Sequence, residues 1–149
     1  MAGLALSLTG RALRLLSARE HSRAELERKL ARYEEEPGRL ARALDALQAK
    51  GFISEERVLA SVLHRRSGKL GAMRIRQELQ AKGLDPQAIA QAVTGLRGSE
   101  VERARAVCRK KFDMPPQDAA ERARQMRFLA ARGFSGDTMR KVIGGSEED

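Results

Sequence analysis

The chain has 149 residues, 42% of them hydrophobic, which is enough apolar material for one compact domain or a few small stacked units. Its 29 Lys and Arg outnumber its 20 Asp and Glu, so the formal net charge is +9 and the isoelectric point is about 10.6. This balance favours a polyanion or an acidic protein surface as the partner. A single cysteine, Cys108, excludes an intramolecular disulfide and favours a reducing, cytoplasmic location.

No segment has the pattern of a membrane-spanning or exported protein. The N-terminal stretch is apolar but short, and it runs directly into Arg11 and Arg14 with no basic segment ahead of it, unlike a signal peptide. No apolar run reaches the roughly 20 residues that a spanning helix needs. We therefore expect a soluble protein without membrane contact, in which residues 1–10 form an N-terminal tail.

Apolar residues recur at steps of three and four along almost the whole chain, and alternating, strand-like stretches are absent. The sequence therefore predicts an all-α fold. Helix starts and stops are marked by residues that cap helices. The starts are the capping boxes Ser22–Glu25 and Ser99–Glu102 and the pair Asp85–Pro86, and the stops are Gly51, Gly83 and Gly133.

The same apolar pattern returns about every fifty residues. Leu30, Leu79 and Leu129 are separated by 49 and 50 residues, and the helix that follows each of them keeps the same offset. In that helix Leu40, Leu44 and Leu47 correspond to Ile89, Val93 and Leu96, and the first two correspond further to Met139 and Ile143. A preceding amphipathic helix is indicated by Leu13–Leu16, Val58–Leu63 and Val101–Val107, so each repeat should contain three helices.

These offsets divide the chain, in order, into three-helix repeats over 11–53, 54–98 and 99–145, followed by an acidic tail at 146–149. A unit of this size cannot bury its apolar faces alone, so neighbouring repeats should stack. We expect an elongated, curved array with a long exposed surface. Such an array has no need of a second subunit to complete a core, which favours a monomer.

Residues suited to catalysis are few. His64 should end a helix and stay solvated, and His21, which precedes a helix cap, is interpreted in the same way. Cys108 should be a buried, inert thiol. The turn Gly68–Gly71 lacks the glycine and hydroxyl residues of a phosphate-binding loop and is interpreted as a flexible turn. We expect no enzyme activity, no cofactor and no metal site.

Basic residues carry more information than any catalytic motif. In the first repeat they alternate with Glu and are interpreted as the solvated side of amphipathic helices. In the second and third repeats they crowd together, and the scarcity of aromatic residues predicts electrostatic contacts that are indifferent to base sequence. The candidate contact residues are Arg65, Arg66, Lys69, Arg74, Arg76 and Lys82, followed by Arg103, Arg105, Arg109, Lys110, Lys111 and Arg132.

An ordered set of motifs along nearly the whole chain resembles the RecX family of RecA modulators. The stretches that carry the resemblance are Ala12–Leu30, Lys50–Arg57, Lys69–Gly83, Lys110–Phe112 and Arg127–Ser135. The resemblance implies binding to the RecA–single-stranded DNA filament. It also implies inhibition of filament extension, ATP hydrolysis, strand exchange and co-protease activity. Whether the basic residues contact RecA, single-stranded DNA or both, with duplex DNA as a further non-specific partner, stays open at this point.

The chief alternative is a helix-turn-helix protein, because three-helix units with a basic helix commonly enter the major groove of DNA. Arg74, Arg76 and Gln77 would then read bases from one helix. That function predicts a marked sequence preference and dimeric half-sites, whereas a RecX-type function predicts neither.

Overall fold

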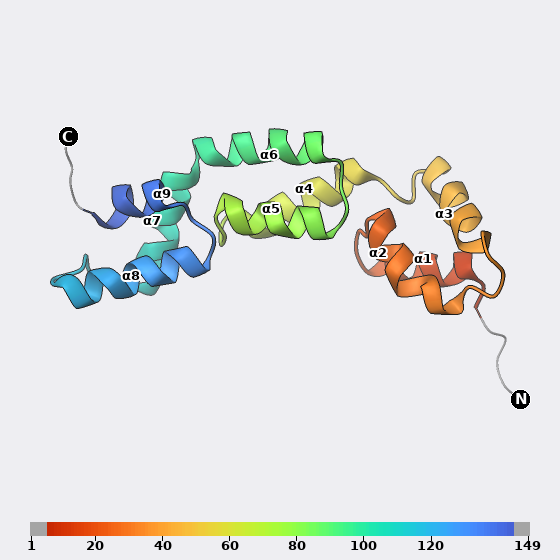
Figure 1. Ribbon diagram of the computed structural model, residues 1–149, viewed down its shortest axis with the longest axis horizontal. Helices are drawn as coiled ribbons and strands as arrows, with labels where there is room; N and C mark the ends of the chain where they lie inside the picture. Colours follow the sequence, from red (N-terminus) through yellow and green to blue (C-terminus); the bar gives the residue numbers. More distant parts are fainter. Residues whose placement is uncertain (1–5, 145–149) are drawn as a thin grey trace, which may run out of the picture. The chain divides into compact units, whose positions relative to one another are not determined.

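The computed structural model describes residues 6–144, which are entirely helical apart from turns and short connections (Figure 1). The described range contains no strand, so the predicted all-α fold is confirmed. The helices are α1 (Leu8–Ala18), α2 (Arg23–Leu30), the 3-10 helix η1 (Ala31–Tyr33), α3 (Arg39–Ala49), α4 (Glu55–Arg66), α5 (Ala72–Ala81), α6 (Pro86–Gly98), α7 (Glu100–Lys111), α8 (Ala119–Ala131) and α9 (Gly136–Ile143).

The fifty-residue register reappears in the packing. Leu30, Leu79 and Leu129 are buried near the ends of α2, α5 and α8, the middle helices of three consecutive three-helix groups. In the third helix of each group the matched positions are also buried or half-buried. The glycines that follow the middle helices, Gly83 and Gly133, have φ angles of 72° and 89°, which residues with a Cβ rarely adopt. Their role as helix stops is therefore confirmed.

Contacts group the chain into two compact units. The first unit contains Ser61 and the described residues before it, together with Lys82–Leu84. Inside it α1 packs against α2 and α3. The core of this unit consists of the buried side chains Ala12, Leu26, Leu30, Leu40, Leu44, Leu47 and Ile53.

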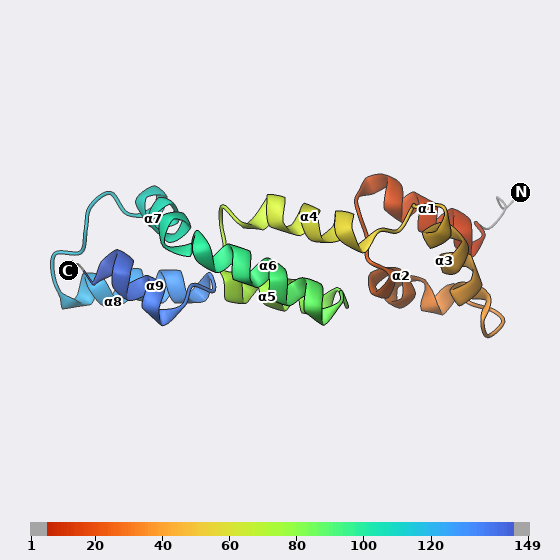
Figure 2. The same cartoon turned by 90° about the horizontal axis from the view of Figure 1, so that it is seen from above.

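The second unit contains Val62–Ala81 and the described residues from Asp85 onward. Within it α5 packs along α6, and α7, α8 and α9 pack against one another. Figure 2 shows these helices from above. The core shared by α7 to α9 consists of Ala104, Val107, Cys108, Leu129, Phe134 and Ile143. Cys108 is thus buried, as the sequence predicts.

Most helices begin at a side chain that accepts a backbone N–H of the first turn. Ser22 and Glu25 form the predicted capping box, and Asp85 accepts the N–H of Ala88. The capping box expected at Ser99 is wrong, because its hydroxyl donates instead to the Leu96 carbonyl and accepts from Arg103.

The two ends of the chain differ from the tails expected from the sequence in what the structure describes. Helix α1 begins at Leu8, inside the stretch expected to be a tail, because the Ser7 hydroxyl accepts the N–H of Gly10 at 2.9 Å. The acidic tail expected at 146–149 lies outside the described residues. None of the helices in residues 6–144 is both long and apolar enough to span a membrane.

Candidate functional site

Most of the excess positive charge of the described residues belongs to the second unit. Its described residues include 17 Lys and Arg and 8 Asp and Glu, whereas the first unit has 12 and 9. Cations therefore exceed carboxylates by 3 in the first unit (12 − 9) and by 9 in the second (17 − 8). A search for a site that binds anions begins in the second unit.

A cleft of about 340 Å³ in the second unit gathers four cations around an apolar wall. Lys69 comes from the turn between α4 and α5, Lys110 and Lys111 end α7, and Arg132 follows α8. Val107 and Phe128 supply the wall, and Gly68 completes the lining. We call this set of seven residues the cationic cleft. All four of its cations belong to the set of contact residues predicted from the sequence.

Arg132 has an unusual environment within the cationic cleft. Its guanidinium carbon lies 4.4 Å from the centroid of the Phe128 ring, which is the geometry of a cation–π contact. Its Nε atom is buried and has no hydrogen-bond partner within residues 6–144. A buried, unpaired donor is energetically costly, so most are satisfied in folded proteins. Within residues 6–144, Arg132 therefore keeps one buried donor without a hydrogen-bond partner.

The turn that carries Lys69 is held in place by Arg103 from α7. The half-buried guanidinium of Arg103 donates to the carbonyls of Ser67 at 2.8 Å and Leu70 at 2.7 Å. It also donates to the Leu96 carbonyl at 3.0 Å. Burial lowers the pKa of Arg103, an effect that the nearby Glu100 carboxylate opposes. These hydrogen bonds hold the Gly68–Gly71 turn in place, which corrects the expectation of a flexible turn.

Glu100, one turn before Arg103, ties the starts of two other helices to α7. One carboxylate oxygen accepts the N–H of Ala72 at 3.0 Å, and the other accepts the N–H of Ser135 at 2.9 Å and the hydroxyl of Thr138 at 3.0 Å. Only 4% of Glu100 is exposed. Burial by itself would raise its pKa, but the hydrogen bonds from Ser135, Ala72 and Thr138 outweigh it and lower the pKa. The first turn of α7 thus holds the starts of α5 and α9 in place.

Backbone hydrogen bonds join the start of α5 to the turn after α8. The N–H of Gly71 donates to the Arg132 carbonyl at 2.7 Å, and that of Met73 donates to the Gly133 carbonyl at 3.2 Å. Arg74 adds a side-chain hydrogen bond to the Ala131 carbonyl at 2.6 Å. This junction fixes Arg132 relative to the turn that carries Lys69. It also occupies Arg74, one of the predicted contact residues, with an internal contact.

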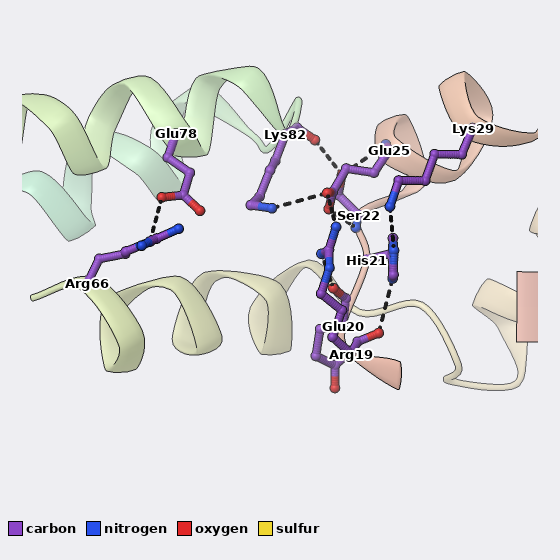
Figure 3. Close-up of polar contacts among 9 residues, drawn as sticks. All are labelled: Arg19, Glu20, His21, Ser22, Glu25, Lys29, Arg66, Glu78 and Lys82. Atoms are coloured by element: carbon purple, nitrogen blue, oxygen red, sulfur yellow. Dashed lines mark hydrogen bonds and ion pairs between the residues drawn. The ribbon is translucent and has the colours of Figure 1, made fainter. Parts of the chain in front are cut away.

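Lys82, the predicted contact residue of the first unit, is neutralised inside that unit (Figure 3). Its ammonium lies 3.1 Å from the Glu25 carboxylate, which also pairs with Arg19 at 3.0 Å. The Lys82 side chain is only 12% exposed. Burial opposes ionisation of Glu25, but hydrogen bonds from Arg19, Ser22 and Lys82 lower its pKa to about 2. Lys82 therefore has its counterion within the protein.

His21, expected to be solvated, is buried with 2% of its surface exposed, so that expectation is wrong (Figure 3). Its Nδ1 lies 3.1 Å from the Arg19 carbonyl and its Nε2 lies 3.0 Å from the Lys29 ammonium. The ammonium can only donate, so Nε2 accepts and Nδ1 carries the proton. Nothing in the local sequence indicates this burial, since the contacts come from the fold of the first unit. His64 is exposed, as expected.

The other predicted contact residues lie elsewhere in the second unit. Arg66 pairs with Glu78 at 3.1 Å, as Figure 3 shows, and Arg65 and Arg76 are exposed on α4 and α5. Arg105 and Arg109 are exposed on α7 and line a separate cleft with Met114 and Pro115. The structure thus brings four of the twelve predicted residues together in the cationic cleft. It gives Arg103, Arg74, Arg66 and Lys82 internal partners.

Catalytic groupings do not emerge from the fold within residues 6–144. No three His, Cys, Asp or Glu side chains of this range gather as metal ligands would. Burial raises the pKa of the Cys108 thiol, whose sulfur lies 3.7 Å from the Gln125 side-chain oxygen. A raised pKa disfavours the thiolate, which is the nucleophilic form.

Comparison with known families matches all three three-helix groups in order. The models of the first, second and third three-helix domains of RecX match residues 10–47, 54–93 and 99–143. The regulatory protein RecX of Leptothrix cholodnii is 54% identical over 138 residues, covering 93% of this chain and 88% of that protein. That of Herminiimonas arsenicoxydans is 46% identical over 149 residues, covering 100% and 99%.

Solved structures agree on the fold. The crystal structure of a regulatory protein RecX superposes with a TM-score of 0.74 at 20% identity, covering 98% of this chain and 83% of that one. RecX from Lactobacillus salivarius superposes with a TM-score of 0.72 at 21% identity, covering 92% of each chain. The resemblance that the sequence motifs carry is confirmed by the family models and by the relatives. The chain belongs to the RecX family of regulatory proteins.

Proposed function

We propose that this protein regulates a RecA-type recombinase by binding the RecA–single-stranded DNA filament and inhibiting its extension. Slower ATP hydrolysis, strand exchange and co-protease activity follow from the same binding. The observation that carries the proposal is the ordered match of all three RecX domains along the chain. The cation surplus of the second unit supports it, because a filament on DNA presents phosphates at regular intervals.

The proposal also covers the location and oligomeric state of the protein. It acts as a cytoplasmic monomer, without a cofactor and without catalysing a reaction. Regulation by binding needs no catalytic group, and the buried, high-pKa thiol of Cys108 is not poised for one. Duplex DNA would bind only through its backbone, without a sequence preference.

The test is the rate of ATP hydrolysis by RecA on single-stranded DNA, measured while the purified protein is added. We expect the rate to fall at near-stoichiometric or lower amounts, and we expect no ATP hydrolysis in matched reactions that lack RecA. An unchanged RecA rate, together with tight binding to one duplex sequence, would contradict the proposal and favour the helix-turn-helix alternative.

A further inference from the structure

We propose that the cationic cleft binds one phosphodiester group of single-stranded DNA, with Arg132 as its anchor. This inference rests on the proposed function, because it names the part of the filament that the second unit contacts. It commits to nucleic acid where the sequence left RecA and DNA equally open.

The cationic cleft lacks an internal anion. None of its seven lining residues is acidic, and Arg132 forms no ion pair within residues 6–144. The buried Nε of Arg132 is one of the donors in the planar fork with which guanidinium groups bind phosphate oxygens. The Phe128 ring shields one face of that fork from water. Because Nε is buried, an anion in the cleft would engage it only after a shift of the Arg132 side chain, and that shift would satisfy a donor left unpaired within residues 6–144.

The equivalent position of the preceding repeat shows that this arrangement is particular to the third repeat. Lys82 precedes Arg132 by 50 residues and follows the corresponding middle helix, α5. There the cation is compensated by Glu25. The residue 49 positions after Glu25 is Arg74, so the compensating carboxylate has been replaced by another cation. The same place in the repeat thus changes from an internal ion pair to an uncompensated charge.

The walls of the cleft are fixed before any ligand arrives. Arg103 holds the carbonyls on either side of Lys69, and Glu100 holds the start of α5. A site whose backbone is already ordered loses less conformational entropy on binding than one on a loose loop. Beside Lys69, a Cβ added at Gly68 would meet nothing within 4 Å, so the approach to the turn is open. The backbone of the turn is thus ordered before a ligand binds.

The size and charge of the surroundings favour a nucleic-acid strand over an acidic peptide. The volume of about 340 Å³ is near the lower end of small-ligand sites, which span about 300–1,000 Å³, and suits one phosphate with its sugar. The second unit also has surplus cations outside the cleft. This distribution fits a partner whose negative charges repeat along its length, as the phosphates of a nucleic acid do. A single strand can bend one phosphate into a recess, whereas duplex DNA is stiff over about 150 base pairs.

The experiment measures the affinity of the full chain for a fluorescein-labelled oligothymidine by anisotropy, over a series of KCl concentrations. The variants are Arg132→Gln and Lys110→Gln, and the matched control is Arg122→Gln, which removes an exposed cation of α8 outside the cleft. We expect each cleft variant to weaken binding about tenfold, as loss of a charged hydrogen bond does. Each should also reduce the slope of log affinity against log salt by about 0.7. The control should lose less than about twofold.

Circular dichroism accompanies each measurement. Should Arg132→Gln lose helicity, Lys110→Gln still tests the cleft, because Lys110 is exposed. Wild-type affinity and salt slope in folded cleft variants would overturn the inference. RecA inhibition measured on the same samples separates the two proposals. Variants that lose inhibition but keep oligothymidine binding would assign the cleft to an acidic RecA surface and overturn only this inference. A wild-type protein that binds oligothymidine through the cleft without inhibiting RecA would overturn the proposed function.

Discussion

His21 is held between the Arg19 carbonyl and the Lys29 ammonium in the first unit, and its neutral form suits that position. Lys29 donates to Nε2, so a proton on Nε2 would set two donors against each other. Burial is the largest cause of its lowered pKa, and the charges of Arg19 and Lys29 act in the same direction. The Arg19 carbonyl and the Glu25 carboxylate oppose them without reversing the shift. In the folded protein the His21 ring therefore stays neutral at pH values where the same ring in the unfolded chain is protonated.

Stability of the first unit should consequently fall in mildly acidic solution. The ordinary pKa is 6.5 and the folded-state pKa is lower, so the contribution is fully present above about pH 6.5 and is lost as the pH falls toward the folded value. We expect the urea midpoint of the wild-type protein, followed by circular dichroism, to drop between neutral pH and a pH of about 5.5. His21→Gln should flatten this drop, whatever its effect on absolute stability.

His64→Gln is the matched control, because His64 is exposed. It should keep the wild-type dependence on pH. A His21→Gln protein whose midpoint falls as steeply as that of the wild type would show that another group is responsible.

Single residues were the hardest features to predict from sequence. Glu25 could be recognised because its capping role involves a residue three positions away. Arg103 could not, since it bonds carbonyls 33 and 36 residues away that only the folded chain brings near. Local charge density therefore groups Arg103 with the exposed cations of α7. For Arg132 the sequence indicates the charge, and only the structure indicates the missing partner.

At the scale of elements, the junction between α5 and the turn after α8 depends on close backbone approach. A Cβ added at Gly71 would fall on the carbonyl group of Gly133, which accepts a hydrogen bond from Met73. Neither backbone can move away without breaking the hydrogen bonds of the junction. Gly71 is thus required for contact with a segment more than sixty residues further along the chain.

Gly71→Ala should therefore destabilise the second unit by about 1–3 kcal/mol, the usual cost of overpacking. Gly68→Ala in the same turn is the matched control, because its added Cβ meets nothing within 4 Å. Thermal unfolding of the two variants should show a lowered midpoint for Gly71→Ala and a near wild-type midpoint for Gly68→Ala. Equal midpoints would mean that the junction is looser than the hydrogen bonds indicate.

Elements were more predictable than single residues, because helix periodicity and caps are local. The fifty-residue offset of Leu30, Leu79 and Leu129 correctly predicted the three middle helices. The prediction failed at Ser99, where α6 passes into α7 and the hydroxyl serves the preceding helix. A capping pattern specifies the residues but not which of two adjoining helices they serve.

For the whole molecule, membership of the RecX family and the charge surplus of the second unit lead to one account. Three-helix domains present cations on a scaffold held by Glu100 and Arg103, and within residues 6–144 the buried Nε of Arg132 has no hydrogen-bond partner. Composition alone predicts only an acidic partner. The RecA filament is inferred as the partner from the family resemblance. The position of the cationic cleft is known only from the fold.

The most direct test of this account is the length of RecA filaments on long single-stranded DNA, imaged by electron microscopy during assembly. We expect the wild-type protein to shorten the filaments. A variant that carries Arg109→Glu, Lys110→Glu and Lys111→Glu at the exposed end of α7 should shorten them much less while keeping its helicity, because exposed charges change stability little. Filaments that reach the same length with and without the wild-type protein would contradict the account.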